Sequence, residues 1–212
     1  MSDFRIVIPC KALAEGKSRL APLLSSSERY ELCVALLQQT IDVAVEITAP
    51  DHIWLTTPDD VAKAVASKQG INVVADNGTG LNTALELART AIHGQAGALK
   101  SGLMVLPIDL PLIDPTAIGR SITAGAEVTI AADRAKTGTN FLYLKGPAIV
   151  RFPFSYGANS FHRHCASARR YKYRLRVIDD FALAFDLDEP DDLVQLARAV
   201  PLTSGAKPNS AA

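Results

Sequence analysis

Acidic residues stand at two places where apolar stretches of this sequence meet polar ones. Asp109 ends the apolar run 103–108, and Asp186 and Asp188 alternate with two apolar residues. In an extended segment that alternation sends both carboxylates to one face. Mg²⁺ prefers one or two carboxylates together with phosphate oxygens, so these residues suit a metal and phosphate site. A turn or capping role for Asp109 and a helix-capping role for Asp188 are the alternatives.

Cations gather in a second segment. Residues 11–20 (KALAEGKSRL) carry Lys11, Lys17 and Arg19 directly after the first apolar run of the chain. Lysine and arginine placed in a loop are suited to gripping phosphates. A solvated basic loop without any ligand has the same composition, so this segment alone does not predict a phosphate site.

A third segment is rich in glycine. Residues 76–82 (DNGTGLN) contain Gly80 and Asn82 between an apolar run and a helical pattern. Glycine leaves backbone N–H groups open to close approach, so such a turn can receive a phosphate or the edge of a base. An ordinary tight turn without a ligand is an equally good interpretation of these residues.

These segments need a scaffold that brings them together, and the patterning predicts one. In open α/β sheets ligands bind outside the carboxyl ends of the strands. Short apolar runs alternate with helical patterns through the first half of the chain, which favours a mainly parallel sheet. Ser25 and Glu28 form a capping-box pattern that starts the first helix. The expected strands are 4–9, 52–57, 71–76 and 103–109, and the expected helices are 25–45, 59–68, 81–92 and 115–123.

The regular alternation of strand and helix ends in the second half of the chain. Strands are expected over 128–133, 140–145 and 174–179 with only one helix, 159–170, among them. We expect an antiparallel edge and a substrate-binding annex there. Pro190 starts a last helix, since proline suits the first helical position. The sequence contains no internal repeat or interior linker, so we expect one domain over 1–200 and a loose tail over 201–212.

Composition excludes several classes of partner. The 212 residues are 48% hydrophobic and 21% charged, and 22 Lys plus Arg balance 22 Asp plus Glu. No net field would hold the chain on a nucleic acid or an anionic membrane. The first residues lack the pattern of a signal peptide, and no run reaches the roughly 18 apolar residues of a membrane span. We therefore expect a soluble, cytoplasmic protein with no nucleic-acid or membrane partner.

Cysteine and histidine do not predict a metal centre. Cys10, Cys33 and Cys165 are odd in number and widely spread, as buried or idle thiols are. His162 and His164 would face different ways on a helix, with no carboxylate in the adjoining sequence.

Taken together, these segments resemble the CofC/FbiD family, the guanylyltransferases of coenzyme F420 biosynthesis, which are relatives of the molybdenum-cofactor and sugar-phosphate nucleotidyltransferases. The match runs through nearly the whole chain, and its first loop, Pro9-Cys10-Lys11, lacks the Gly-Gly start of the wider superfamily but agrees with the narrower family. The resemblance rests on six segments in order: 17–20 (KSRL), 80–82 (GLN), 106–112 (LPIDLPL), 133–140 (DRAKTGTN), 156–161 (YGANSF) and 186–193 (DLDEPDDL).

The resemblance implies a fold and a set of site residues. The fold would be an α/β, three-layer, Rossmann-like nucleotide-diphospho-sugar transferase type with a mostly parallel sheet and an antiparallel edge. The implied roles are Mg²⁺ binding by Asp109, Asp186 and Asp188; catalysis by Lys17, Arg19 and Asp109; nucleotide binding by Lys11, Lys17, Arg19, Gly80 and Asn82; and acceptor binding by Thr139, with Thr137 as the second choice, Gly157 and Ser160.

The implied reaction transfers GMP from GTP to a phosphorylated three-carbon acid and releases pyrophosphate. The acid is phosphoenolpyruvate, 3-phospho-D-glycerate or 2-phospho-L-lactate, with phosphoenolpyruvate preferred. The acceptor phosphate is largely dianionic at neutral pH and needs no general base. A downstream F420 transferase would receive the product. Whether the chain forms a homodimer is left open by the sequence. The rival hypotheses are a nucleotidyltransferase for a sugar phosphate or molybdopterin and a non-catalytic nucleotide-binding module.

Overall fold

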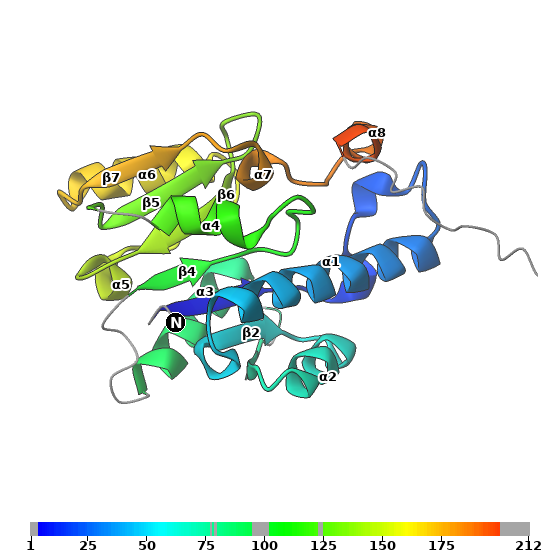
Figure 1. Ribbon diagram of the computed structural model, residues 1–212, viewed down its shortest axis with the longest axis horizontal. Coiled ribbons are helices and arrows are strands. Elements are labelled where there is room, and N and C mark those ends of the chain that lie inside the picture. The colour runs from blue at the N-terminus through cyan, green and yellow to red at the C-terminus, as the bar shows by residue number, and fades with distance from the viewer. Residues whose placement is uncertain (1–3, 77, 79, 95–101, 123–124, 200–212) are drawn as a thin grey trace, which may run out of the picture.

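The computed structural model describes residues 4–76, 78, 80–94, 102–122 and 125–199. Seven strands form one mixed sheet in the order β3-β2-β1-β4-β6-β5-β7 (Figure 1). The strands are β1 (Arg5–Pro9), β2 (Ile53–Thr57), β3 (Asn72–Ala75), β4 (Leu103–Val105), β5 (Val128–Ala132), β6 (Thr139–Leu144) and β7 (Leu175–Ile178).

The first four strands are parallel, and only β6 is reversed among the described strands. It pairs antiparallel with β4 on one side and with β5 on the other, while β7 pairs parallel with β5. The mostly parallel sheet with antiparallel pairing is thus confirmed, but the reversed strand lies inside the sheet and not at its edge. Because β6 runs backwards, its first residue, Thr139, lies at the edge where the parallel strands end.

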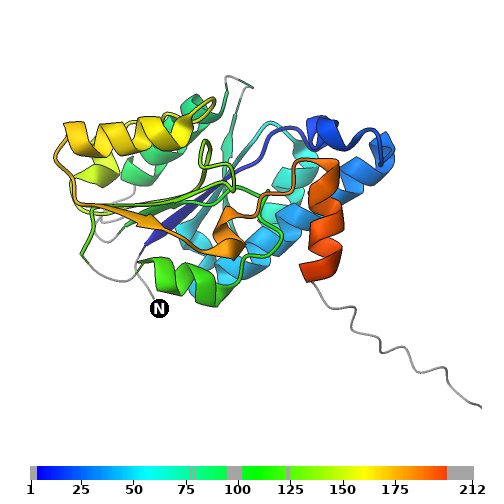
Figure 2. The same ribbon diagram turned by 90° about the horizontal axis from the view of Figure 1, so that it is seen from above.

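Helices cover both faces of the sheet, which makes three layers (Figures 1 and 2). One face carries α1 (Ser26–Ile47), α2 (Asp60–Lys68), α4 (Pro115–Ile122) and α7 (Phe181–Ala184), and the other carries α3 (Leu81–Gly94), α5 (Ala148–Arg151) and α6 (Ser160–Arg170). Three short 3-10 helices are η1 (Leu13–Glu15), η2 (Ser18–Leu20) and η3 (Pro50–His52). The last helix, α8 (Pro190–Ala199), lies at the same end of the molecule as the loop with η1 and η2 in both views.

Strand alternation divides the core between the two faces. Ile6 and Ile8 of β1 pack with α1 and α2, whereas Val7 packs with α3. The predicted capping box of α1 is confirmed, since Ser25 accepts from the N–H of Glu28 and Glu28 accepts from the N–H of Ser25. The first helix is therefore anchored at its start by local sequence and along its length by the sheet.

Three expectations need correction. The fourth strand ends at Val105 and not at Asp109, because Pro107 has no N–H for the ladder. The second half contains two further one-turn helices, α5 and α7, which are too short to give a periodic pattern. The segment 185–188 is extended but pairs with no described strand as a ladder. The expected loose tail, 201–212, lies outside the described residues.

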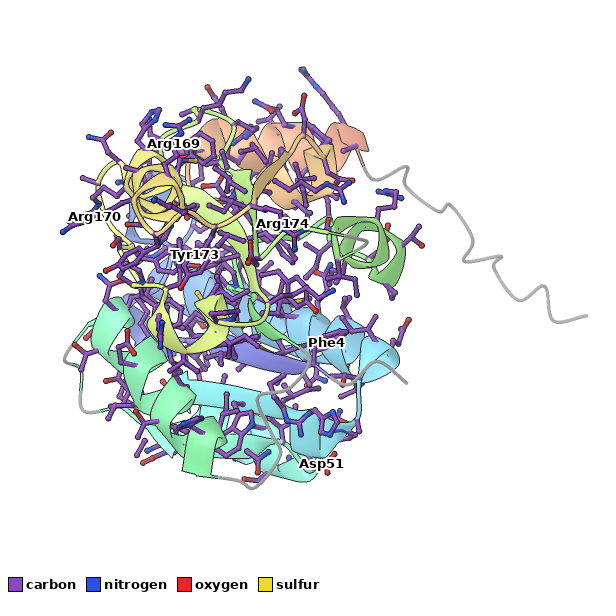
Figure 3. All side chains as sticks on the ribbon, turned by 90° about the vertical axis from the view of Figure 1, so that its left-hand side faces the viewer. Phe4, Asp51, Arg169, Arg170, Tyr173 and Arg174 are labelled. Atoms are coloured by element: carbon purple, nitrogen blue, oxygen red, sulfur yellow. The ribbon has the colours of Figure 1, made fainter. Side chains whose placement is uncertain are left out.

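The amino ends of the strands form the side of the molecule seen in Figure 3. Phe4 and Asp51, which precede β1 and β2, face the viewer there together with Arg174, which precedes β7. Arg169 and Arg170, at the end of α6, gather on the same side. This basic cluster is thus at the opposite edge from the strand ends that carry the predicted site. None of the helices that the structure describes is long and apolar enough to cross a membrane.

Candidate active site

A cavity of about 940 Å³ opens at the carboxyl ends of the first four strands. Its walls come from the loop after β1, the ends of β2 and β3, the start of α3 and the segment after β4. The polar residues that line it include Lys11, Lys17, Thr56, Asp76, Asp109 and Asp188. The segments singled out in the sequence therefore meet at one place, as the rule for open α/β sheets predicts.

Lys17 is the buried cation at the floor of this cavity. Its backbone adopts the left-handed conformation with φ of 52°, and its carbonyl accepts from the N–H of Leu20 to form η2. The side chain is only 2% exposed, and its Nζ donates to Oδ1 of Asp109 and, at 3.0 Å, to Oδ1 of Asp188. Burial alone lowers the pKa of Lys17, but the two carboxylates outweigh it and the pKa is raised. Lys17 is therefore a fixed positive charge.

Backbone contacts set the positions of the two carboxylates that Lys17 joins. The N–H of Leu187 donates to the carbonyl of Asp109 at 2.9 Å. The N–H groups of Asp188 and Glu189 donate to Oδ2 of Asp192 at 2.8 and 2.6 Å. Asp192 thus holds the acidic segment in place from the first turn of α8.

Asp192 is in turn fastened by Arg134. The Arg134 guanidinium donates to Oδ1 of Asp192 and, at 2.8 Å, to Oε1 of Gln195, and it lies 4.5 Å above the ring of Phe185. Burial opposes ionisation of Asp192, but the hydrogen bonds from Arg134 and from the N–H groups outweigh it, so its pKa is lowered. Sequence reasoning missed this pair as a support for the site, although both residues lie inside family-like segments.

The two aspartates of segment 185–188 have different surroundings. Phe185 and Leu187 are fully buried and Asp186 and Asp188 are half-buried, so the expected alternation is present without a strand. Asp188 lines the cavity, whereas Asp186 is not among the residues that line it. Burial, together with the negative charges of Asp188 and Asp133, raises the pKa of Asp186.

The cavity offers two carboxylates to a divalent cation. The side chains of Asp109 and Asp188 are 42% and 43% exposed, and each has one oxygen on Lys17. Mg²⁺ is commonly held by one or two carboxylates plus substrate phosphates, so this pair fits it. Across the described ranges no group of three His, Cys, Asp or Glu residues is arranged to hold a metal. The structure therefore brings together Asp109 and Asp188 of the predicted set through Lys17, and Asp186 is not among the residues that line the cavity.

The other predicted cations differ in exposure. Lys11 is exposed and lines the cavity. Arg19 is 67% exposed and its Nη1 donates to Oε1 of Glu189 at 3.1 Å. Arg19 thus lies beside the acidic segment and is not among the residues that line the cavity.

Gly80 and Asn82 have separate tasks in the structure. Gly80, with φ of 97°, lines the cavity at the start of α3. The side chain of Asn82 is used elsewhere: its Oδ1 accepts from the N–H of Tyr156 at 2.8 Å and its Nδ2 donates to the carbonyl of Tyr156 at 3.1 Å. Asn82 therefore fastens α3 to the loop 153–159.

Two of the predicted acceptor residues, Thr139 and Ser160, form a buried hydrogen-bonded cluster with His164 near the start of β6. Oγ of Ser160 accepts from the N–H of Thr139, and Oγ1 of Thr139 lies 2.9 Å from Nδ1 of His164. His164 has no exposed surface, and its Nε2 accepts from the N–H of Ser155 at 2.9 Å. Burial, reinforced by the charge of Arg163, lowers the pKa of His164 to about 4. The ring is therefore neutral, with its proton on Nδ1 facing Thr139.

Thr137 and Gly157 are the exposed members of the predicted acceptor set. The N–H and hydroxyl of Thr137 both donate to the carboxylate of Asp133, which accepts the N–H of Gly138 as well. Gly157 has φ of 112°, a conformation that side chains rarely adopt. The structure thus brings all four to the start of α6: Ser160 bonds Thr139 of β6, the N–H of Ser160 donates to the carbonyl of Gly157, and the N–H of Phe161 donates to the carbonyl of Thr137, both at 3.0 Å.

Two solved structures with a similar fold are described as a nucleotidyl transferase and a cytidylyltransferase. A nucleotidyl transferase from Methanothermobacter aligns with a TM-score of 0.62 at 12% identity, over 92% of this chain and 97% of that one. A cytidylyltransferase from Leptospira borgpetersenii aligns with a TM-score of 0.60 at 11% identity, over 92% of this chain and 85% of that one. At these identities the likeness concerns the fold, which is that of the nucleotide-diphospho-sugar transferase type.

Sequence comparison then narrows the class. Residues 4–198 match the family described as "Guanylyl transferase CofC like". The phosphoenolpyruvate guanylyltransferases of Chloroflexus aggregans and Rubrobacter xylanophilus are each 36% identical, over 92% of this chain and 96% and 94% of theirs. The 2-phospho-L-lactate guanylyltransferase of Methanosarcina barkeri is 32% identical, over 91% of this chain and 85% of its own. This chain belongs to the CofC family of guanylyltransferases, as its resemblance predicted.

Proposed function

We propose that this guanylyltransferase transfers GMP from GTP to the phosphate of phosphoenolpyruvate in coenzyme F420 biosynthesis, releases pyrophosphate and depends on Mg²⁺. The observation that carries the proposal is Lys17, a buried ammonium joined to Asp109 and Asp188 in a cavity at the strand ends. The names of the most similar relatives cited above supply the choice of acid.

Reaction between two anions needs positioning and charge neutralisation more than it needs a base. Lys11, Lys17 and Arg19 would bind the triphosphate, and Asp109 and Asp188 would hold the cation, which neutralises phosphate charge when bound. The acceptor phosphate attacks the α-phosphorus of GTP, the bond to the β-phosphate oxygen breaks, and pyrophosphate leaves. Since the acceptor is already largely dianionic at neutral pH, no side chain has to remove a proton.

The acceptor would bind on the β6 side of the site. Gly157 lies in the turn before α6, where the positive end of a helix favours an anion. The N–H groups of Ser160 and Phe161 already donate to the carbonyls of Gly157 and Thr137, so the turn itself would supply the contact. Thr139 and Ser160 are bonded to protein groups and buried, so we assign them the shaping of this turn and leave the direct contact to its backbone.

The test is an acceptor screen. The protein is incubated with Mg²⁺ and GTP plus phosphoenolpyruvate, 2-phospho-L-lactate or 3-phospho-D-glycerate, together with the partner transferase that traps the product, and pyrophosphate is measured. Release that depends on phosphoenolpyruvate and is abolished by EDTA supports the proposal. Release with another acid only, or with phosphoenolpyruvate in EDTA, contradicts it.

A second acceptor is favoured by one observation. A relative at 32% identity is named for 2-phospho-L-lactate, which differs from phosphoenolpyruvate by reduction at one double bond. The same screen separates these two acids, and competition of GTP with CTP and ATP tests the nucleotide.

A further inference from the structure

The cavity contains a polar atom that the protein leaves unsatisfied. Thr56 is 1% exposed and lines the cavity, yet its Oγ1 has no hydrogen-bond partner within the described part of the chain. A buried hydroxyl without a partner destabilises the folded state, so such groups usually have a partner in the working form of a protein. This hydroxyl is therefore a candidate for contact with a ligand.

The side chain of Thr56 is directed to the α3 face of the sheet. Trp54, two residues earlier, packs against α3, and residues two apart in a strand share a face. Leu81 and Ala84 of α3 and Pro9 of β1 form the neighbouring cavity wall, and they are apolar. One hydroxyl set among apolar groups suits a flat heterocycle better than it suits a phosphate.

A carboxylate stands on the adjacent strand end. Asp76 follows β3, is half-buried and lines the same cavity, and its N–H donates to the carbonyl of Thr57 at 3.3 Å. Its Oδ1 accepts the N–H of Gly78 at 3.0 Å. A carboxylate has about four acceptor positions, so capacity remains for a ligand that brings donors.

The position of this pair fits the length of a nucleotide. Lys11 and Lys17 follow β1 and Asp109 follows β4, whereas Thr56 is part of β2 and Asp76 follows β3. Neighbouring strands are about 4.8 Å apart, so β2 lies about 10 Å from β4 along the sheet edge. A nucleoside triphosphate with its phosphates at Lys17 would place its base above β2 and β3.

We propose that Thr56 and Asp76 form the guanine-reading subsite, which rests on the proposed use of GTP. Guanine presents two donors side by side, the ring N–H and the 2-amino group, and a carboxylate accepts from both. Adenine lacks this pair of donors. The carboxylate of Asp76 accepts from guanine, and the hydroxyl of Thr56 bonds the base from the neighbouring strand.

Thr56→Val tests the hydroxyl. Because that hydroxyl is unsatisfied in the free protein, the variant should keep or raise the melting temperature while the KM for GTP rises about tenfold. Thr56→Ser should restore the KM. The effect should persist with 2′-deoxy-GTP, since the contact is to the base. Thr57→Val is the matched control: its hydroxyl accepts from the N–H of Asp59, so it should lower the melting temperature and leave the KM unchanged.

Asp76→Asn tests the carboxylate, since asparagine can keep the turn with Gly78. The wild type should prefer GTP to inosine triphosphate, which lacks the 2-amino group, about tenfold, and the variant should lose that preference. Glu15→Gln, which changes another carboxylate of the cavity, should keep it. An unchanged KM for GTP in Thr56→Val, loss of its effect with 2′-deoxy-GTP, or an unchanged nucleotide preference in Asp76→Asn overturns the inference. If the wild type transfers no guanylyl group, the proposed function fails, and calorimetric binding of GTP and inosine triphosphate to the same variants still decides the inference.

Discussion

The backbone N–H of Leu187 donates a 2.9 Å hydrogen bond to the carbonyl of Asp109. Two acidic segments that are far apart in the sequence are thereby held side by side, with Asp188 next to the bonded residue. Lys17 then joins the two carboxylates from the loop after β1. The charges of the site are thus fixed by the backbone before any ligand binds, which is the condition for electrostatic stabilisation without reorganisation.

Asp109→Asn should reduce guanylyl transfer by about 100-fold or more, because it removes a carboxylate proposed to hold the cation. The fold should remain, since asparagine occupies the same space and keeps the carbonyl that accepts from Leu187. Pyrophosphate release measures the activity and circular dichroism the fold. Near wild-type turnover in a folded variant would remove Asp109 from the proposed metal site.

Arg19→Ala should raise the KM for GTP several-fold and change kcat little. The guanidinium is exposed and pairs with Glu189, so solvent weakens its contribution to binding. Initial rates over a range of GTP concentrations separate the two constants. A loss confined to kcat would instead place Arg19 on the reacting phosphates in the transition state.

Arg134→Ala should destabilise the protein by about 2 kcal/mol, because the buried carboxylate of Asp192 loses its charged partner. Activity should fall as well, since Asp192 holds the N–H groups of Asp188 and Glu189. Urea unfolding measures the free energy, with Arg134→Lys as the control that keeps the charge but not the paired donors. Equal stability of all three proteins would show that α8 is held by other contacts.

Stability should fall as the pH drops from about 6.5 to about 4, in part through His164. The folded protein keeps this ring neutral in that range while the unfolded chain binds a proton, so acid favours unfolding. The shift corresponds to about 3 kcal/mol in total. His164→Asn cannot take up that proton, so the stability gap between wild type and variant should be constant above pH 7 and should narrow toward pH 4. A gap that does not change with pH would contradict the neutral, buried state of His164.

Much of this fold follows from local sequence. The capping box at Ser25, the alternation of strand and helix in the first half and the burial of Phe185 and Leu187 around Asp186 are all predictable, because each leaves a local pattern in the sequence. The end of β4 before Asp109 is predictable as well, because Pro107 has no N–H for the ladder.

The arrangement inside the site could not be predicted in the same way. Lys17 is buried only because residues 92 and 171 positions away supply its two partners. Asn82 has the composition of a ligand contact, yet its amide is used by Tyr156. The unpartnered hydroxyl of Thr56 is a property of the packed protein and leaves no mark in the sequence. Whether a buried polar group has a hydrogen-bond partner depends on tertiary contacts, which local sequence patterns do not predict.

The reversed strand β6 separates the residues proposed to bind the nucleotide from those proposed to bind the acceptor along the chain. The residues proposed to bind GTP come before residue 110, whereas those proposed to shape the acceptor turn come after residue 136. Among the described residues that line the cavity, Asp188, proposed to hold the cation, alone comes from the later half. A backward strand returns the later half to the same working edge as the earlier one. Substitutions in the later half can therefore change the acceptor acid without changing the residues proposed to bind the nucleotide. Asp188 is the exception, because it belongs to the later half and pairs with Lys17 of the earlier one.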